Sequence, residues 1–314
     1  MSPTGPRAAF RTRLREAVEA HGPLCVGIDP HPGLLSAWGL DADPAGVERF
    51  ARGVVEALAG HVALFKPQVA LFEVYGSAGL GALERALADA REAGALTLAD
   101  AKRGDIGSTM AGYARAWLGD DAPLAADAVT LSPYLGVGAL APALDLAVAT
   151  GRGVFVLART SNPEASGVQS AQAWVAGPGG SPPDTQRSGA GHRRMREVAQ
   201  SVVDALADHN AAHAGGLGDG SAGAVVGLTR GTTGRDHGLD LAALGGPVLV
   251  PGLGAQGGTP ADVAAVFGAS GPSGALGEAG GPVVPVSARE VLTAGPDHGA
   301  LRAAVGALNG SLTG

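Results

Sequence analysis

Short runs of apolar residues alternate along the chain with stretches whose apolar residues recur every three or four positions. A run of four or five apolar residues is typical of a parallel strand that is buried on both faces. The three-to-four spacing is typical of an amphipathic helix, since it places the apolar side chains on one face. The pattern predicts strands at Leu24–Ile28, Val62–Phe65, Leu96–Ala99, Ala128–Leu131, Val154–Leu157, Ala224–Gly227, Val248–Val250 and Val283–Val286.

Helical spacing precedes the first strand and fills most of the intervals between the strands. Strands separated by helices are typical of a parallel sheet, and eight such units favour a closed (β/α)8 barrel, the TIM barrel, over an open sheet. We therefore expect an α/β protein with a single catalytic domain over residues 1–314, an extra N-terminal helix and a long insertion after strand five. The predicted helices are Arg7–Ala20, Ala45–Ala59, Gly81–Ala93, Ser108–Trp117, Ala139–Thr150, Arg193–His213 and Pro260–Phe267.

Three segments rich in Gly, Ser and Pro interrupt this pattern: Ala176–Gly191, Ala214–Gly223 and Gly268–Gly281. Such segments bury too little apolar surface to offset the entropy lost on ordering, so their composition predicts loops or disorder. The first segment lies beyond strand five, where an active-site lid could lie.

The composition narrows the class of protein. The chain has 314 residues, 46% of them hydrophobic, which suits one barrel with insertions. Its net charge is −7 and it has no basic block, so we expect no nucleic-acid partner. No apolar run approaches a membrane span and no signal-peptide core is visible, which favours a cytoplasmic protein with no membrane partner. The single cysteine, Cys25, excludes an internal disulfide, and we expect it to be a small buried hydrophobe.

Lysine is rare in this chain. Of the 22 Lys and Arg residues, only Lys66 and Lys102 are lysine. A sequence that otherwise uses Arg needs a specific reason to keep a lysine, which is a compact point charge and can release a proton at accessible pH. Both lysines follow predicted strands, so we interpret them as functional rather than as solvated cations.

Polar residues follow several of the predicted strands, at the end of the barrel where active sites lie. Each also has a simpler structural interpretation: a helix N-cap, a loop with local ion pairs, a turn or a surface ion pair. The loops after strands seven and eight commonly bind phosphate, which glycine N–H groups and a bidentate arginine would suit. The candidates are Asp29, Lys66, Asp100, Lys102, Asp105, Ser161, Gln256 and Arg289.

Six stretches of the chain together resemble one family. Leu98–Thr109, which reads Leu-Ala-Asp-Ala-Lys-Arg-Gly-Asp-Ile-Gly-Ser-Thr, resembles the Asp-x-Lys-x-x-Asp signature of the orotidine 5′-phosphate decarboxylases. The long insertion after strand five resembles the family's longer bacterial branch, whereas Ser132 departs from the family pattern, which has Asn there. The resemblance covers most of the chain and continues at Val26–Pro30, Phe65–Gln68, Arg159–Pro163, Val250–Gly258 and Val286–Arg289.

The resemblance implies a reaction and a role for each matching residue. The reaction is decarboxylation of orotidine 5′-phosphate to uridine 5′-phosphate, the last step of de novo pyrimidine biosynthesis, without a metal or an organic cofactor. The implied catalytic network is Lys66, Asp100, Lys102 and Asp105, with Asp105 reaching into the neighbouring subunit's site of an obligate homodimer. The implied substrate contacts are Asp29 to the ribose, Thr109 to the ribose across the interface, Ser161 to the pyrimidine edge, Pro251 at the base of a mobile loop, and Gln256 and Arg289 to the 5′-phosphate.

The chemistry of this reaction favours a lysine. Loss of CO₂ leaves an electron pair in the plane of the ring, where it cannot delocalise, so stabilisation has to be electrostatic. Lys102 can supply both the charge and the quenching proton, whereas Arg supplies only charge. Three other interpretations stay open: a Mg²⁺-dependent sugar-phosphate decarboxylase or aldolase of the same barrel superfamily, a Schiff-base aldolase, and a non-catalytic barrel that binds a phosphate ligand. Lys66 argues against a cation near strand two.

Overall fold

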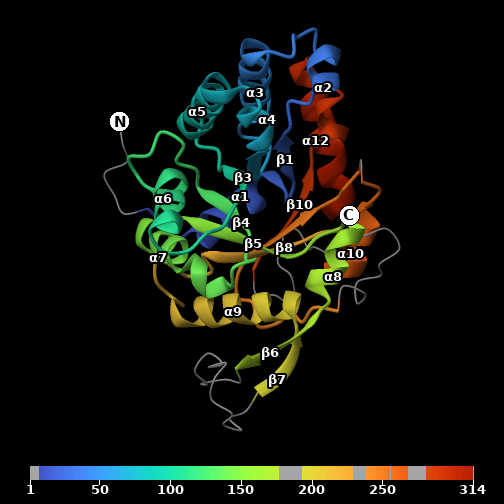
Figure 1. Ribbon diagram of the computed structural model, residues 1–314. Coiled ribbons are helices and arrows are strands. Elements are labelled where there is room, and N and C mark those ends of the chain that lie inside the picture. Colours follow the sequence, from blue (N-terminus) through green and yellow to red (C-terminus); the bar gives the residue numbers. More distant parts are fainter. Residues whose placement is uncertain (1–6, 177–192, 229–237, 255, 268–280, 314) are drawn as a thin grey trace.

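The computed structural model describes residues 7–176, 193–228, 238–254, 256–267 and 281–313 (Figure 1). Its main sheet has eight parallel strands in the spatial order β2-β1-β10-β9-β8-β5-β4-β3. Two isolated bridges, Phe65↔Thr97 and Gln68↔Asp100, join β2 to β3 and close the sheet on itself. The strands are β1 Cys25–Ile28, β2 Leu64–Pro67, β3 Leu98–Arg103, β4 Ala128–Leu131, β5 Gly153–Arg159, β8 Ala222–Val226, β9 Val248–Pro251 and β10 Val283–Ser287.

The predicted (β/α)8 barrel and all eight predicted strands are confirmed, with bounds that shift by a few residues. The main difference concerns the charged residues. We predicted a third strand over Leu96–Ala99 with Asp100 directly after it, but β3 continues through Lys102 to Arg103, so that residues expected in a loop belong to the strand. The last two residues of the predicted loop Ala214–Gly223 likewise begin β8.

Helices surround the barrel, and each helix predicted from the spacing is present, Pro260–Phe267 with the predicted bounds and the others with different bounds. Helix α12 was not predicted, although its buried residues Leu301, Val305, Leu308 and Leu312 have helical spacing. The helices are α1 Phe10–His21, α2 Pro32–Ala37, α3 Pro44–Leu58, α4 Ala70–Glu73, α5 Gly76–Glu92, α6 Gly107–Leu118, α7 Ala141–Thr150, α8 Ser166–Gln169, α9 Val198–Ala212, α10 Pro260–Phe267, α11 Arg289–Leu292 and α12 His298–Thr313, with 3-10 turns η1 Val137–Leu140 and η2 Pro163–Ala165. In the part of the chain that these ranges cover, no helix is long and apolar enough to cross a membrane.

A β-hairpin was not predicted and projects away from the barrel beyond α9 (Figure 1). It consists of β6, Gln172–Ala176, and β7, Arg193–Glu197, which pair antiparallel. The predicted helix Arg193–His213 is therefore wrong over its first five residues, which pair with β6 instead of continuing α9. Residues 177–191 and 268–280, most of two of the predicted loops, lie outside the described residues.

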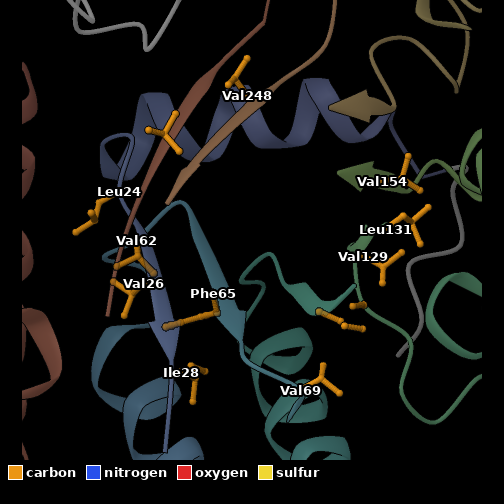
Figure 2. Packing of buried hydrophobic residues seen from close by; sticks show 14 of the residues in the cluster. Leu24, Val26, Ile28, Val62, Phe65, Val69, Val129, Leu131, Val154 and Val248 are labelled. Carbon is orange, nitrogen blue, oxygen red and sulfur yellow. The ribbon is translucent and has the colours of Figure 1, made fainter. Parts of the chain in front are cut away.

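Alternate residues of the strands pack into two separate apolar clusters. Residues such as Val26 and Val129 face outward and pack against the helices in the larger cluster, part of which Figure 2 shows. Residues such as Cys25, Leu98 and Phe155 face the interior of the barrel and form the smaller cluster, together with α1. The period of two therefore separates the outer core from the barrel interior.

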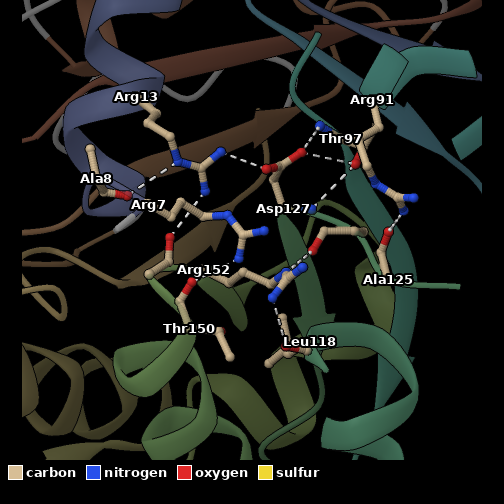
Figure 3. Close-up of polar contacts among 12 residues, drawn as sticks. Arg7, Ala8, Arg13, Arg91, Thr97, Leu118, Ala125, Asp127, Thr150 and Arg152 are labelled. Atoms are coloured by element: carbon tan, nitrogen blue, oxygen red, sulfur yellow. Dashed lines mark hydrogen bonds and ion pairs between the residues drawn. The ribbon is translucent and has the colours of Figure 1, made fainter. Parts of the chain in front are cut away.

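Helix α1 closes the N-terminal end of the barrel. Its Phe10 is fully buried and meets the ring of Phe155 edge to face, with the centroids 6.0 Å apart. Polar groups at this end are paired, as Figure 3 shows: Arg13 contacts Asp127 at 2.5 Å, and Asp127 also accepts hydrogen bonds from Thr97. The buried guanidinium of Arg152 donates to the backbone carbonyls of Ala126 and Leu118.

Candidate active site

A cavity of about 400 Å³ opens at the C-terminal end of the barrel. Many of its lining residues are inward-facing strand residues near the C-terminal end of the barrel. The inward-facing residues nearer the N-terminal end form the smaller apolar cluster. In β3, for example, the row runs from Leu98 through Asp100 to Lys102, so it changes from apolar to charged at the floor of the cavity. The barrel thus holds a small set of polar groups above an apolar plug, which is the usual character of a ligand site.

Asp100 is the centre of the hydrogen bonding in this cavity. Its carboxylate lies 2.8 Å from the Lys66 ammonium and 2.7 Å from the Lys102 ammonium. It also accepts hydrogen bonds from Thr130 Oγ1 at 2.9 Å and from Gln68 Nε2 at 3.1 Å. Four donors from three strands and a following loop therefore fix one carboxylate.

The two lysines differ in their exposure. The Lys66 side chain is 6% exposed and its partner Asp100 9%, so this pair is nearly dry. The Lys102 side chain is 46% exposed and reaches the cavity, with its ammonium held at one end by Asp100. Lys66 thus has a supporting position, while Lys102 offers its ammonium to a ligand.

The charges of the buried pair reinforce each other. Burial alone raises the pKa of the Asp100 carboxyl, but the neighbouring Lys66 and Lys102 ammonium groups outweigh it and hold the pKa well below its usual range. Burial lowers the pKa of the Lys66 ammonium, but Asp100 and Asp29 outweigh it and raise the pKa above its usual value. The floor of the cavity therefore stays ionised at neutral pH.

The backbone at Lys102 is bulged. Ala99 pairs with Val129 and Arg103 with Leu131, so β3 has three residues where β4 has only Thr130. The Lys102 N–H donates to Thr130 Oγ1 at 2.9 Å, and Lys102 has a φ of +48°, the only positive φ of a non-glycine residue among those described. Bulges of this kind redirect side chains next to active sites.

Asp29 follows β1 and lies at the wall of the cavity. Its Oδ1 is buried and has no hydrogen-bond partner among the described residues. A buried carboxylate oxygen without a donor is costly, at about 1–3 kcal/mol or more. A hydroxyl of a bound ligand would satisfy it.

The loop after β9 forms another wall. Gly252, Gly254 and Gly257 have φ values of 113°, 80° and 92°, which favour glycine, and this brings the backbone into a tight turn closed by the Gly258 N–H donating to Gly252 O at 3.0 Å. Gln256 in this loop accepts a hydrogen bond from Ser161 Oγ at 3.2 Å. The contact joins the loop after β5 to the loop after β9 over the cavity.

Eight of the ten predicted site residues line this one cavity: Asp29, Lys66, Asp100, Lys102, Ser161, Pro251, Gln256 and Arg289. Asp105 and Thr109 do not line it. The Asp105 carboxylate accepts a hydrogen bond from the N–H of Ile106, and Thr109 is exposed on α6. Within this chain, the structure therefore does not bring these two residues to the cavity.

Several cavity residues were not predicted, although the strand pattern indicates two of them. Thr130 is the single polar residue in the apolar strand β4, and Gln68 lies two positions after Lys66 and hence on the same face. Period-two reading of each strand would have found both. Thr160, Asn162 and His31 also line the cavity from loops, where no such periodicity exists.

Comparisons with known proteins agree with this geometry. Residues 22–177 match the family model described as "Orotidine 5'-phosphate decarboxylase / HUMPS family". Orotidine 5′-phosphate decarboxylases from Salinispora arenicola and Streptomyces coelicolor are 53% and 51% identical to the chain over 296 residues, which cover 94% of this chain and 94% of each relative.

Solved structures give the same result for the fold. A crystal structure from Streptomyces avermitilis superposes with a TM-score of 0.81 at 48% sequence identity, covering 98% of this chain and 96% of that one. The structure of Leishmania donovani OMP decarboxylase superposes with a TM-score of 0.67 at 24% identity, covering 97% and 99%, and supports the fold alone.

Proposed function

The chain belongs to the orotidine 5′-phosphate decarboxylase family and catalyses the decarboxylation of orotidine 5′-phosphate to uridine 5′-phosphate in pyrimidine biosynthesis, and we propose that the ammonium of Lys102 carries this reaction. In the proposed step the bond between C6 and the carboxylate breaks, CO₂ leaves, and the electron pair stays on C6. Lys102 stabilises this carbanion and then donates a proton to it, and the neutral amine regains a proton from solvent.

One observation carries this proposal: the Lys102 ammonium reaches the cavity while Asp100 holds it at 2.7 Å. A preorganised donor aimed at developing charge typically contributes about 3–4 kcal/mol to catalysis. The Lys66 ammonium, buried behind Asp100, keeps that carboxylate charged and in place. The ammonium of Lys102 therefore needs little reorganisation when negative charge develops at C6.

We propose that the remaining cavity residues bind the nucleotide. The Asp29 Oδ1, which has no hydrogen-bond partner in the part of the chain that the structure describes, accepts a hydrogen bond from the ribose, and Ser161 contacts the pyrimidine edge. Gln256 and Arg289 hold the 5′-phosphate beside the glycine turn that follows Pro251. Because phosphate binds far from C6, its binding energy serves to order the loops and exclude water from the reacting atoms.

We propose that the active enzyme is a homodimer in which Asp105 and Thr109 complete the partner's site. Large apolar side chains are exposed in the segments that follow β3 and β4: Ile106, Tyr134 and Leu135 are 63%, 81% and 54% exposed. The two segments start side by side, since the Ser132 N–H donates to the Arg103 carbonyl at 2.8 Å, and exposed large apolar side chains on neighbouring segments favour an interaction surface. A C2 axis would bring the same surface of a second copy against them.

Subunit mixing tests the shared site. Lys102→Ala and Asp105→Ala homodimers should each be inactive, but each mixed dimer would contain one intact site and one site with both changes. Random exchange should therefore restore about a quarter of the wild-type sites. If the mixture stays inactive although exchange is verified by mass spectrometry, Asp105 does not act across the interface.

The reaction itself is tested by the loss of orotidine 5′-phosphate absorbance on addition of pure protein in EDTA. We expect full activity in wild type and none in Lys102→Arg, because a guanidinium cannot give up the proton. Activity that disappears in EDTA and returns with Mg²⁺ would favour the magnesium-dependent relatives instead. The single-domain organisation over residues 1–314 and the cytoplasmic location stay predictions.

A further inference from the structure

Arg103 lies directly after Lys102 but on the opposite face of β3. Neighbouring residues of a strand point to opposite faces, so Lys102 enters the cavity while Arg103 points into the layer of helices outside the barrel. Arg103 does not line the cavity, and its side chain is 25% exposed. Its guanidinium therefore does not contact a ligand in this cavity, and its direct connection to Lys102 is through the β3 backbone.

The Arg103 guanidinium is held by groups from β3, α4 and α6. It donates to the carboxylate of Glu73, the last residue of α4, and to the carbonyl of Ala101 at 3.2 Å. The same guanidinium lies 5.7 Å from the ring centroid of Tyr113 and 6.0 Å from that of Trp117, both on α6. Planar guanidinium groups suit such a combination of fork geometry and ring contact, whereas an ammonium group does not.

The backbone next to this anchor is strained. Lys102 has a left-handed φ of +48°, a conformation that costs a residue with a Cβ on the order of 1–2 kcal/mol. Such strain persists only where the surroundings over-determine it. Here the Lys102 N–H is fixed by Thr130 on one side, and on the other side the Arg103 carbonyl accepts a hydrogen bond from the Ser132 N–H at 2.8 Å.

We infer that Arg103 is a positioning residue for the reaction: its anchorage to Glu73 and to the rings of α6 holds the left-handed turn at Lys102 and thereby aims the Lys102 ammonium at Asp100 and at C6. This inference rests on the proposed role of Lys102. The charge of Arg103 lies outside the cavity, so it cannot act on the substrate directly. The inference gives Arg103 a structural role instead.

The kinetic test uses Arg103→Met, which keeps the length of the side chain but removes the fork and the charge. A displaced catalytic group costs up to about 100-fold in rate. We expect kcat to fall by about 10- to 100-fold, with KM for orotidine 5′-phosphate and the Kd for uridine 5′-monophosphate within about threefold of wild type, because the contacts to ribose and phosphate are untouched.

Two further variants serve as a partner variant and a control for this test. Glu73→Gln keeps the shape of the Arg103 partner and should give a smaller fall in kcat of the same kind. Arg85→Met removes a comparable arginine, paired with Glu48 between α3 and α5, and should leave kcat unchanged. A kcat of Arg103→Met within twofold of wild type, or a rise in KM at unchanged kcat, would overturn the inference.

A second readout does not depend on activity. If Arg103 holds the turn, Lys102→Gly should unfold at a higher temperature than Lys102→Ala, because glycine adopts positive φ freely. In the Arg103→Met background this difference should shrink, since residue 102 can relax. A difference that is unchanged by Arg103→Met would overturn the inference, whereas an active Lys102→Ala enzyme would instead overturn the proposed function.

Discussion

The two ends of the barrel satisfy their polar groups in opposite ways. At the N-terminal end, the guanidinium of Arg152 and the carboxylate of Asp127 each have several partners, and α1 seals the interior with Phe10. At the C-terminal end, the described residues include three buried side-chain atoms without a hydrogen-bond partner: Asp29 Oδ1, Arg159 Nε and Ser287 Oγ.

All three of these atoms lie where a strand ends. Asp29 follows β1, Arg159 is the last residue of β5, and Ser287 is the last residue of β10. The strained backbone of Lys102 belongs to the same end. Of these residues, Asp29 lines the cavity, whereas Arg159 and Ser287 do not. The barrel therefore pairs the polar groups named above at its N-terminal end, and at its C-terminal end it leaves the Asp29 carboxylate and the strained backbone of Lys102 where a ligand can use them.

Lys102→Ala should have the largest effect on activity and a small effect on stability. Loss of both the electrostatic stabilisation and the proton donor should lower kcat by about 10⁴-fold or more. The free energy of unfolding should change by less than about 1 kcal/mol, because the side chain is half-exposed and Lys66 still pairs with Asp100. Steady-state kinetics and urea unfolding of one preparation measure kcat and the free energy of unfolding. A large loss of stability would show that the C-terminal end of the barrel also stabilises the fold.

Phe10→Ala is the complementary change at the N-terminal end of the barrel. Removing a fully buried ring next to Phe155 should lower the free energy of unfolding by about 3–5 kcal/mol. The kcat of the folded fraction at 25 °C should match wild type, because the cavity lies at the other end. Thermal unfolding and kinetics check this, and a reduced kcat without loss of stability would contradict the separation of the two ends.

Arg289→Ala should affect ligand affinity at the C-terminal end of the barrel without affecting stability. A charge-assisted hydrogen bond to phosphate is worth about 1.5–3 kcal/mol, so KM should rise by roughly 10- to 100-fold. Because the Arg289 side chain is exposed, the melting temperature should stay constant. Inhibition by inorganic phosphate should weaken in parallel; unchanged affinity for phosphate-bearing ligands would remove Arg289 from the phosphate site.

Cys25 should give the smallest effect, which is on the pH dependence of stability. It lies in the barrel interior, between the two ends. Burial raises the pKa of its thiol from 9.0 to about 12. Between these values the thiol ionises only in the unfolded state, so a rise in pH removes stability, by about 1 kcal/mol at pH 10. The free energy of unfolding should therefore fall less steeply above pH 9 in Cys25→Ala than in wild type. Rapid labelling of native Cys25 by a thiol reagent at pH 8 would contradict its burial.

The fold was largely predictable because each strand of this barrel is buried on both faces. Runs such as Ala128–Leu131 then have no polar alternation to confuse them with a surface strand. The charged residues were predictable for a different reason: a chain with two lysines shows plainly where a lysine is needed, and Lys66 and Lys102 share a carboxylate in the structure.

The rest depended on contacts that sequence spacing does not contain. The bulge at Lys102 follows from the hydroxyl of Thr130 on the neighbouring strand, which no local pattern reports. The β6–β7 hairpin needs pairing across residues 177–192, so its strand Arg193–Glu197 reads as the start of a helix. For Asp105 and Thr109 the predicted contacts belong to a second copy, which one chain cannot supply.

The closure of the barrel between β2 and β3 has a consequence for how activity is lost. Among the described residues, two isolated bridges join these strands, whereas every other neighbouring pair is joined by a ladder, with bulges in the β3–β4 and β5–β8 ladders. Lys66 lies on β2 and Asp100 on β3, so their ion pair joins the two strands across this seam. A partial opening of the barrel there would pull the two charges apart while the other strands stay paired. Catalytic activity should therefore be lost at a lower temperature than that of global unfolding. In hydrogen-exchange experiments, the amide protons of β2 and β3 next to this seam should exchange first.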